Sequence, residues 1–398
     1  MKSMYRGAIA SAIALAIAPT SWSAPTYTGD IAPLFHQKCA ECHRPNQVAP
    51  MSLLTYEETR PWAKSIKEKV IKREMPPWFE KGEMHRFTGD MRLTQDEIDT
   101  IVSWVDGNAP KGNPKDMPNI PTFNDGWKLG EPDMIIELDT VSIGEGSNDT
   151  LFNVPVPFEL DGDRYVTAVE ILPEPSQIVH HVILFASDDR EGRRAGILNW
   201  MQGWAPGINA LPFPEGSGRL LKKDAVLSAN LHLTPRGEGG DSIIKFGFHL
   251  ADKGEDLVES FNHWTINNMF KIPANDPNHF VKAAWTAPYD VTVFGLAPHM
   301  HYRGKDMKFT AVYPDGKKEL LLDSIWSNEW QLFYNPVVPF QFPKGTKIEV
   351  TGHFDNSKEN ELNPNPNEEV KWGLSVKEEM FIGYIDYMPQ QKSEKDSD

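Results

Sequence analysis

Apolar residues near the start of the chain recur at the spacing of a helix face. Trp62, Ile66 and Val70 follow one another at four-residue intervals, which places their side chains on one side of an α-helix. Thr55 and Thr94 each stand three residues before a glutamate, which is the arrangement of a capping box at a helix start. The pattern predicts a helical region from residue 26 to about residue 110.

Further along the chain, short β-branched runs replace the helical pattern. Such runs are typical of strands, and they occupy 166–171, 243–250, 291–295 and 348–351. A Pro-Asp-Gly sequence after Tyr313 lies between two apolar runs, which is typical of a β-hairpin. Residues 111–124 are rich in Pro and Asn and lack apolar periodicity, so we expect an interdomain linker there.

The two ends of the chain differ from the rest. Lys2 and Arg6 flank the start of a short apolar stretch that runs to Ala18, which predicts a signal peptide over residues 1–24. A retained anchor is the alternative, although the stretch is too short to span a bilayer well. No other stretch has the length and apolar character for a span, so we expect no stable membrane insertion. Residues 390–398 are polar and charged, and we expect a disordered tail.

Composition limits the classes of partner. The chain has 398 residues with 40% hydrophobic content, enough for two or three domains with their own cores. Its formal charge of -16 argues against nucleic acid and anionic membranes as partners. Such a surface favours basic redox partners, although acidity is also a common source of solubility.

The only two cysteines lie in the run Cys39-Ala40-Glu41-Cys42-His43. This C-x-x-C-H spacing is the attachment signature of c-type haem, in which both thiols bond the porphyrin and the histidine binds the iron. A redox pair or a structural disulfide is the alternative. Covalent haem attachment in bacteria takes place outside the cytoplasm, so the motif and the predicted signal peptide both indicate a bacterial periplasm.

The helical pattern around this motif resembles a class I c-type cytochrome, which implies a second axial ligand to the haem iron, and Met75 is our choice. It lies in Arg73-Glu74-Met75-Pro76-Pro77-Trp78, where two prolines would stiffen the loop that presents its sulfur. Thioether ligation raises the haem potential. A packing role is the alternative for Met75, and the rival ligands are Met51, Met84, Met91, His36 and His85.

Three histidine clusters stand out in the second half of the chain: His180-His181, His232, and His299-Met300-His301. Residues two apart in a strand share a face, so His299 and His301 can chelate one ion. Imidazole suits copper, zinc, iron or nickel. His180 and His181 can share an ion only across a bend or through different ring nitrogens. The alternatives are a polar strand face and two unrelated histidines.

Two resemblances follow from these motifs. Residues 25–110 resemble a class I c-type cytochrome, which implies a small all-α haem domain. The order of the histidine clusters, followed by Glu378-Glu379-Met380-Phe381, resembles the copper type II, ascorbate-dependent monooxygenases (the peptidylglycine α-hydroxylating monooxygenase and dopamine β-hydroxylase family). That second resemblance spans roughly residues 150–388. Together they imply a multidomain chain, with an all-α cytochrome c domain followed by two all-β, jelly-roll-like sandwich domains at 125–270 and 271–389.

The monooxygenase resemblance also implies cofactors and ligands. Two copper ions would face one another across a solvent-filled cleft. His180, His181 and His232 would hold the electron-transfer copper. His299, His301 and Met380 would hold the oxygen-binding copper, which faces substrate. Core packing in a strand is the alternative for Met380.

The chain departs from the family in two respects. The animal enzymes have disulfides in these domains, whereas this chain has no cysteines there. Ala297 stands where the peptide-amidating enzymes have an arginine that helps bind the substrate carboxylate. Tyr384 matches a substrate-contacting tyrosine, but Ile382 replaces its asparagine neighbour, so a peptide C-terminus is a poor expectation. His249, His263, His279 and His353 have no place in the pattern.

The expected function is a periplasmic copper monooxygenase that hydroxylates a C–H bond of a small organic substrate with O2. A periplasmic donor would supply electrons through one covalent haem c to two copper ions. One alternative is a haem–copper dehydrogenase that passes electrons from a small substrate to an acceptor. The other is a non-catalytic copper-binding electron carrier.

Overall fold

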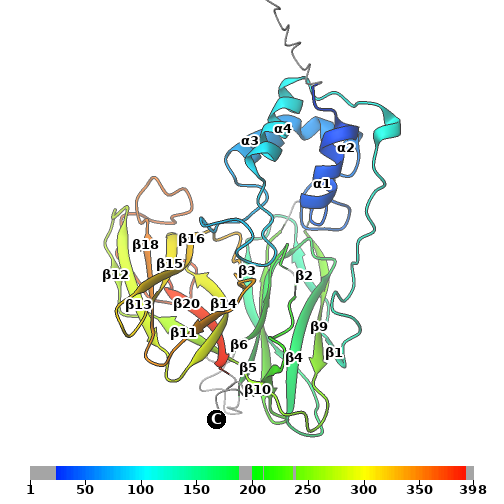
Figure 1. Cartoon of the computed structure of the whole chain (residues 1–398). Coiled ribbons are helices and arrows are strands. Elements are labelled where there is room, and N and C mark those ends of the chain that lie inside the picture. The colour runs from blue at the N-terminus through cyan, green and yellow to red at the C-terminus, as the bar shows by residue number, and fades with distance from the viewer. Residues whose placement is uncertain (1–23, 188–199, 209, 236–238, 391–398) are drawn as a thin grey trace, which may run out of the picture.

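The computed structural model describes residues 24–187, 200–208, 210–235 and 239–390. Short helices lie at one end of the molecule, above two units built of β-sheets that stand side by side (Figure 1). The strands of the first β body lie within residues 134–259, and those of the second β body within residues 261–389. The predicted signal peptide and C-terminal tail lie outside the described residues, apart from Ala24 and Gln390. Within the described ranges, no helix has the length and apolar character needed to cross a membrane.

The helices begin where the sequence places their caps. Thr55 and Thr94 each form both hydrogen bonds of a capping box, which confirms those two predictions. Trp104 and Phe35 are buried at the centre of the helical core. The helical elements are η1 (Tyr27–Ile31), α1 (Ala32–Lys38), α2 (Tyr56–Thr59), η2 (Arg60–Trp62), α3 (Ala63–Ile71), α4 (Gln95–Asp106) and η3 (Pro114–Asp116).

The predicted fold class is wrong, because residues 25–110 do not form an all-α cytochrome c domain. The structure is mostly β, with 39% strand and 12% helix. The four α-helices have only 7, 4, 9 and 12 residues. Between α3 and α4 the chain leaves the helices altogether and joins a β body.

Residues 78–88 pair with strands far away in the sequence. Lys81 N–H donates to the Asp323 carbonyl at 2.9 Å, and Thr88 N–H donates to the Asn335 carbonyl at 2.8 Å. Trp78 and Phe87 are buried in the core of the second β body. An independent all-α domain would bury such residues in its own core, so these contacts explain why the helical prediction fails here.

The first β body consists of two packed sheets. Its larger sheet has the order β1-β9-β4-β7-β10, with β2 also paired to β9, and its smaller sheet has the order β3-β8-β5-β6. Apolar side chains of both sheets, among them Val169, Phe246 and Leu231, share one core. The strands are β1 (Met134–Glu137), β2 (Val141–Gly144), β3 (Thr150–Val156), β4 (Arg164–Glu174), β5 (Val179–Ser187), β6 (Trp200–Trp204), β7 (Ser217–Leu221), β8 (Val226–Leu233), β9 (Gly239–Leu250) and β10 (Val258–Glu259).

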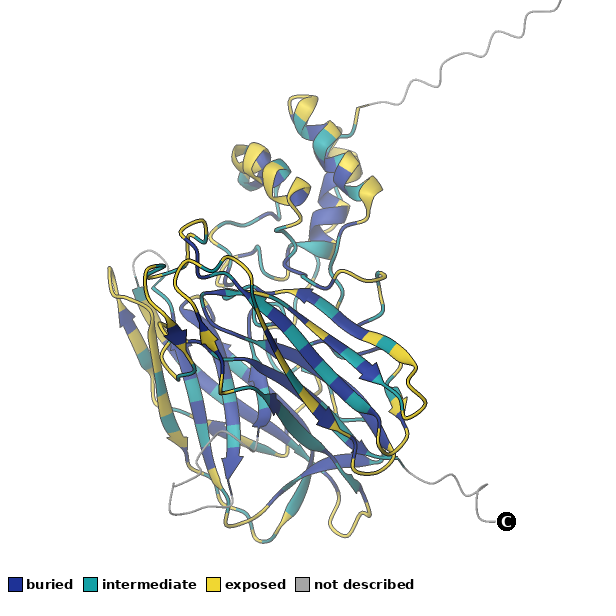
Figure 2. Ribbon diagram, turned by 90° about the vertical axis from the view of Figure 1, so that its left-hand side faces the viewer, coloured by how far each residue is buried: buried dark blue, intermediate teal, exposed yellow. Residues whose placement is uncertain are grey.

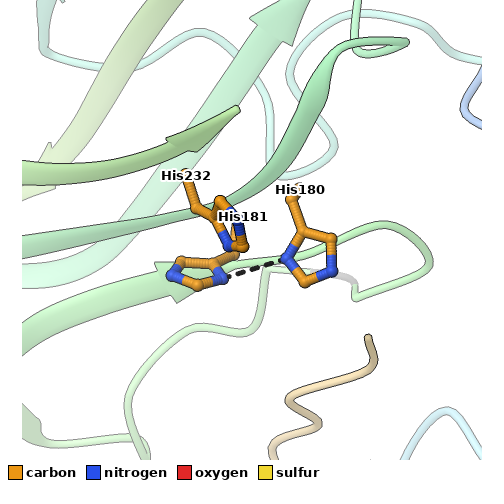
Figure 3. Close-up of side chains that lie close together, drawn as sticks. All are labelled: His180, His181 and His232. Carbon is orange, nitrogen blue, oxygen red and sulfur yellow. Dashed lines mark hydrogen bonds between the residues drawn. The ribbon is translucent and has the colours of Figure 1, made fainter. Parts of the chain in front are cut away.

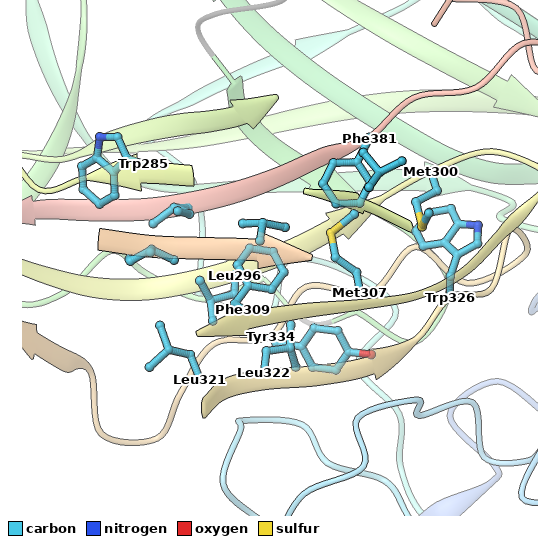
Figure 4. Packing of buried hydrophobic residues seen from close by; sticks show 14 of the residues in the cluster. Trp285, Leu296, Met300, Met307, Phe309, Leu321, Leu322, Trp326, Tyr334 and Phe381 are labelled. Carbon is cyan, nitrogen blue, oxygen red and sulfur yellow. The ribbon is translucent and has the colours of Figure 1, made fainter. Parts of the chain in front are cut away.

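The second β body also pairs two sheets, with the orders β11-β20-β14-β17 and β13-β18-β15-β16. Figure 4 shows Leu296, Met307 and Phe309 packed between the sheets with Tyr334 and Phe381. Buried and exposed positions alternate along the strands (Figure 2), as expected when one face of each sheet meets a core. The strands are β11 (Phe261–Ile266), β12 (Lys271–Ile272), β13 (His279–Thr286), β14 (Val291–His299), β15 (Gly304–Val312), β16 (Lys318–Ile325), β17 (Phe340–Phe342), β18 (Lys347–Phe354), β19 (Val370–Lys371) and β20 (Ile382–Pro389).

Ion pairs attach the segment around the C-x-x-C-H motif to the residues that lead into the first β body. Arg44 lies 2.6 Å from Asp125, and Lys128 lies 3.0 Å from Glu41. The backbone N–H of Lys128 donates to Glu170 on β4 at 2.6 Å. The segment around the C-x-x-C-H motif is therefore attached to the first β body. Residues 78–88, further along the same N-terminal region, are attached to the second β body.

Candidate metal and haem sites

A β-bulge brings the first three histidines together. Strand β5 pairs with β8 so that Val179 faces Leu233 and His181 faces His232, which leaves His180 as the extra residue. A bulge places two residues of one strand opposite one residue of its partner. His180 and His181 can therefore point to the same side, which supplies the bend that the sequence argument required.

The three imidazoles form a compact, buried group (Figure 3). Their candidate ligand atoms all lie within 4.8 Å of one another. His180 Nδ1 lies 3.2 Å from His181 Nδ1, and the rings of His180 and His232 have centroids 4.4 Å apart. Three neutral imidazoles at this separation fit a copper or zinc ion. No other group of three His, Cys, Asp or Glu side chains in the described ranges meets this distance criterion.

Burial favours the uncharged form of two of these histidines. Burial lowers the pKa of His181 well below its ordinary value, and the neighbouring His232 and His180 lower it further. The pKa of His232 is also lowered by burial, although Asp149, 3.3 Å from its Nε2, partly offsets the effect. Neutral imidazole is the form that binds a metal ion, so the lowered pKa values favour metal binding at neutral pH.

The second cluster lies at the end of β14. His299 is the last residue of that strand, and His301 lies in the turn that leads to β15. Their ring centroids are 5.4 Å apart. Met300, between them, is fully buried in the core of the second β body, so the two histidines lie on the opposite side, as the alternation predicts.

Hydrogen bonds fix both rings of this pair through Nδ1. His299 Nδ1 lies 3.0 Å from Gln331 Oε1, and His301 Nδ1 lies 3.1 Å from the Glu378 carbonyl. When each Nδ1–H donates in this way, Nε2 is left as the ligand atom. Burial lowers the pKa of His299 to about 3, so this ring is also neutral.

Glu379 ties the segment that contains Met380 to the histidine pair. Its carboxylate accepts hydrogen bonds from the backbone N–H groups of His301, at 2.8 Å, and Arg303, at 2.7 Å. The side chain is completely buried, and burial raises its pKa, while the N–H groups of His301 and Arg303 and the Arg303 charge oppose this and favour the carboxylate. Met380 itself packs against a small apolar cluster that includes Ala297 and Tyr384. The sequence analysis missed Glu379, although its place directly before the predicted methionine ligand was a usable signal, and it missed Gln331, for which no signal existed.

The two clusters share one small cavity between the β bodies. His181 and His299 both line it, and its volume is about 20 Å³. Trp200 also lines it, and its ring centroid lies 4.9 Å from the rings of both Tyr384 and Phe333. The resemblance implied a solvent-filled cleft, whereas this space holds about one water molecule. The expected substrate contact, Tyr384, does lie on the wall of this cavity.

The C-x-x-C-H motif forms a tight turn after α1. The Cys39 carbonyl accepts hydrogen bonds from the N–H groups of both Cys42, at 3.2 Å, and His43, at 2.9 Å. His43 Nδ1 lies 3.2 Å from the Met51 carbonyl, which leaves Nε2 for an iron ion. Both cysteines are free thiols, and burial raises the pKa of Cys39 to about 12 and of Cys42 to about 11. These residues fit the attachment of one haem.

Three of the candidate methionines lie near this motif. Met51 packs against the same helical core as Cys39, and Met75 and Met91 have other positions. Met75 lines a cavity of about 600 Å³ with Val70, Leu93 and Ile98, which belong to the helical core that Cys39 also contacts. Met91 lies elsewhere: its Cε and Cys42 Sγ are both within 4 Å of the position that a Cβ atom would take on Gly207. The assignment of Met75 as axial ligand stays a prediction, and Met51 and Met91 remain its rivals.

Four histidines that have no place in the cluster pattern, His249, His263, His279 and His353, have other partners. His353 Nδ1 lies 2.9 Å from Asp306, His249 Nε2 lies 3.0 Å from Glu170, and His279 Nδ1 lies 3.2 Å from Asp276. His263 stacks on Trp285 with ring centroids 5.1 Å apart. Each has a structural role outside the two clusters.

Comparison with known proteins adds little to this picture. No family model and no curated protein matches the chain. Among solved structures, it is similar to the major capsid protein P2 of bacteriophage PM2, with 9% identity, a TM-score of 0.27, and coverage of 65% of this chain and 98% of that chain. A structure of the infectious bursal disease virus Gx strain shows 8% identity and a TM-score of 0.21, covering 65% of this chain and 72% of that chain. Likenesses at these scores support no conclusion about fold or function.

Proposed function

We propose that this protein is a copper-dependent monooxygenase that hydroxylates a C–H bond of a small organic molecule. The observation that carries the proposal is the shared cavity, because His181 from the first cluster and His299 from the second both line it. Two copper ions bound at these clusters would supply one-electron transfer and the activation of O2. A thioether ligand favours the reduced copper ion that reacts with O2, which fits Met380 as third ligand of the second site.

The chain's own residues prepare both sites. The bulge at His180 sets three ring nitrogens in one place. Gln331 and the Glu378 carbonyl orient His299 and His301. The aromatic side chains of Trp200, Phe333 and Tyr384 leave space for about one water molecule in the cavity, which keeps the site largely dry.

The C-x-x-C-H motif supports a covalent haem c as the entry point for electrons. Cys39 and Cys42 would bond the porphyrin, and His43 Nε2 would bind the iron. A periplasmic redox protein would reduce this haem, one electron at a time, in place of ascorbate. The compartment belongs to the proposal, since it rests on the predicted signal peptide and on the haem motif.

The substrate that fits the cavity is uncharged. Among the described residues that line it, none is Asp, Glu, Lys or Arg. Burying an unpaired charge there would be costly, while the rings of Trp200, Phe333 and Tyr384 suit an apolar or aromatic molecule. Because the cavity is small, at least one of these rings must move when the substrate enters.

Metal analysis is the first test. The mature chain, produced in a periplasm with haem-attachment machinery, should bind about two copper ions per haem, and His180→Ala and His299→Ala should each remove about one. The reduced protein should then consume O2 and incorporate labelled oxygen into a neutral substrate. A copper content that is insensitive to both substitutions would refute the two-site assignment.

A non-catalytic copper carrier is the second candidate, and the small cavity favours it. Such a protein would bind the same two ions, but its reoxidation by O2 would be independent of any substrate. Benzyl alcohol, benzoate and benzylamine provide a matched series of neutral, anionic and cationic probes. A monooxygenase predicts faster reoxidation with benzyl alcohol than with the two charged probes, whereas a carrier predicts one rate for all three.

A further inference from the structure

One short segment, Gly203–Gly207, lies between the haem motif and the histidine clusters. Gly203 and Trp204 line the small cavity together with His181 and His299. The same two residues, with Gly207, line a second cavity of about 320 Å³ together with Cys42. The segment thus forms a wall of both cavities.

The segment approaches the haem motif most closely at Gly207. A Cβ atom built on this glycine would lie only 3.7 Å from Cys42 Sγ, so the sulfur that would bond the porphyrin is close to the Gly207 backbone. Gly207 has a φ of +81°, a conformation that favours glycine. A turn closed by the Ile208 N–H and the Ala205 carbonyl, at 3.0 Å, keeps this approach in place.

The other end of the segment belongs to the strand beside His181. In the β5–β6 pairing, Trp204 faces Val182, which directly follows His181 in the sequence. The ring of Trp204 packs against the core of the first β body. From Gly207 to Trp204 the chain spans at most roughly 11 Å, so the path from the haem motif to this strand is short.

The ion pairs described above keep the two ends of this path together. Arg44, two residues after Cys42, pairs with Asp125, and Glu41 pairs with Lys128. Lys128 is itself bound to Glu170 of the first β body. The motif is therefore held against the body that contains His180, His181 and His232.

We propose that Gly203–Gly207 is the electron route from a haem bonded at Cys42 to a copper ion held by His180, His181 and His232, with Trp204 as the bridging side chain. The inference rests on the proposed function. In the step, one electron leaves the ferrous haem and reduces copper(II) to copper(I), and no bond forms or breaks. Electron transfer slows steeply with distance across empty space, and Trp204, which lines both cavities, offers a continuous protein path across that gap.

Flash photolysis tests the route in the full-length protein loaded with haem and copper(II). A photochemically generated one-electron donor reduces the haem, and the loss of ferrous haem absorbance is then followed in time. In the wild-type protein the decay should be independent of protein concentration, as expected for transfer within one molecule. Trp204→Leu should slow it by at least about tenfold, whereas Trp204→Phe, which keeps an aromatic ring, should change it much less.

Trp127→Leu is the matched control, because Trp127 lines the larger cavity with Cys42 but lies outside the segment. Haem content, copper content and the copper(II) resonance spectrum establish that each variant keeps both sites. Equal decay rates for Trp204→Leu and the wild type would overturn the route while leaving the proposed function intact. The absence of concentration-independent decay in the wild-type protein would instead overturn haem-to-copper transfer itself.

Discussion

Single residues decide which groups can act as ligands in this molecule. His180 contributes to the first cluster only because a bulge displaces it from the regular strand alternation. The sequence identified the histidines from their spacing, and it stated the geometric condition for the adjacent pair. It could not identify Gln331, which lies 32 positions from His299 in the sequence but 3.0 Å away in space.

The axial ligand of the haem can be settled by paired substitutions. We expect Met75→Ala to lower the haem reduction potential and abolish the thioether-to-iron charge-transfer absorption, because a thioether ligand raises the potential. Redox titration and absorption spectra of the purified protein provide the measurement.

Met91→Ala is the control for this experiment, since Met91 lies beside Cys42. We expect it to leave both the potential and the absorption band unchanged. The reverse pattern would make Met91 the ligand.

We expect Glu379 to position the second metal site, because its carboxylate binds the backbone N–H groups of His301 and Arg303. In Glu379→Gln, one of the two accepting oxygens becomes an NH2 group that faces a backbone N–H, so a buried hydrogen bond is lost. We expect copper affinity at the His299–His301 site to fall by about tenfold or more and the free energy of unfolding to fall by roughly 1–3 kcal/mol. Chelator competition in the His180→Ala background isolates the affinity of this site.

Glu378→Gln serves as the comparison, because the Glu378 side chain is exposed and bonds the turn at Ser375. The Glu378→Gln substitution should leave the copper affinity and the free energy of unfolding unchanged, because His301 Nδ1 bonds the backbone carbonyl of Glu378 and not its side chain. Equal copper affinities for the two variants would argue against a positioning role for Glu379.

At the scale of elements, the starts of two helices could be predicted from the sequence, whereas the contacts of the segment between α3 and α4 could not. The capping boxes at Thr55 and Thr94 depend on residues three positions apart, so local sequence is sufficient to find them. Periodicity could not reveal that Trp78 and Phe87 would pack against Tyr334, at ring-centroid distances of 5.3 and 5.5 Å. Which core an apolar side chain joins depends on contacts between distant parts of the chain.

A substitution that removes a buried side chain from residues 78–88 should destabilise the protein as a core substitution in the second β body would. Phe87 is 2% exposed, and Phe87→Ala would leave a cavity beside Tyr334. We expect the free energy of unfolding to fall by roughly 3–5 kcal/mol, measured by urea denaturation with tryptophan fluorescence.

Ile71→Ala provides a control in the helical region, because Ile71 is 52% exposed. We expect a change close to zero for this variant. A Phe87→Ala protein as stable as the wild type would mean that residues 78–88 contribute little to the β body.

At the scale of the whole molecule, the buried histidines link stability to pH. Burial holds the pKa of His299 at about 3 in the folded protein, against 6.5 for the ordinary side chain. Below pH 6.5 the unfolded chain binds a proton at this position that the folded chain does not, so acidification destabilises the folded state. The stability of the metal-free protein should therefore fall between about pH 6 and pH 4, by about 1.4 kcal/mol per pH unit from this residue alone.

Urea denaturation at several pH values checks this expectation with His299→Gln beside the wild type. The variant lacks the titrating group, so its stability should depend less steeply on pH in that range. Parallel curves for the two proteins would show that His299 titrates normally in the folded state.

The pairing of residues 78–88 with the second β body also has a consequence for how the chain matures. Arg86 bonds a carbonyl 234 positions later, and Thr88 bonds one 247 positions later. At a synthesis rate of 5–20 residues per second, their partners emerge roughly 12–50 s after them. During that interval Trp78 and Phe87 lack their native core, so the nascent chain exposes two large apolar side chains and depends on chaperones to stay soluble.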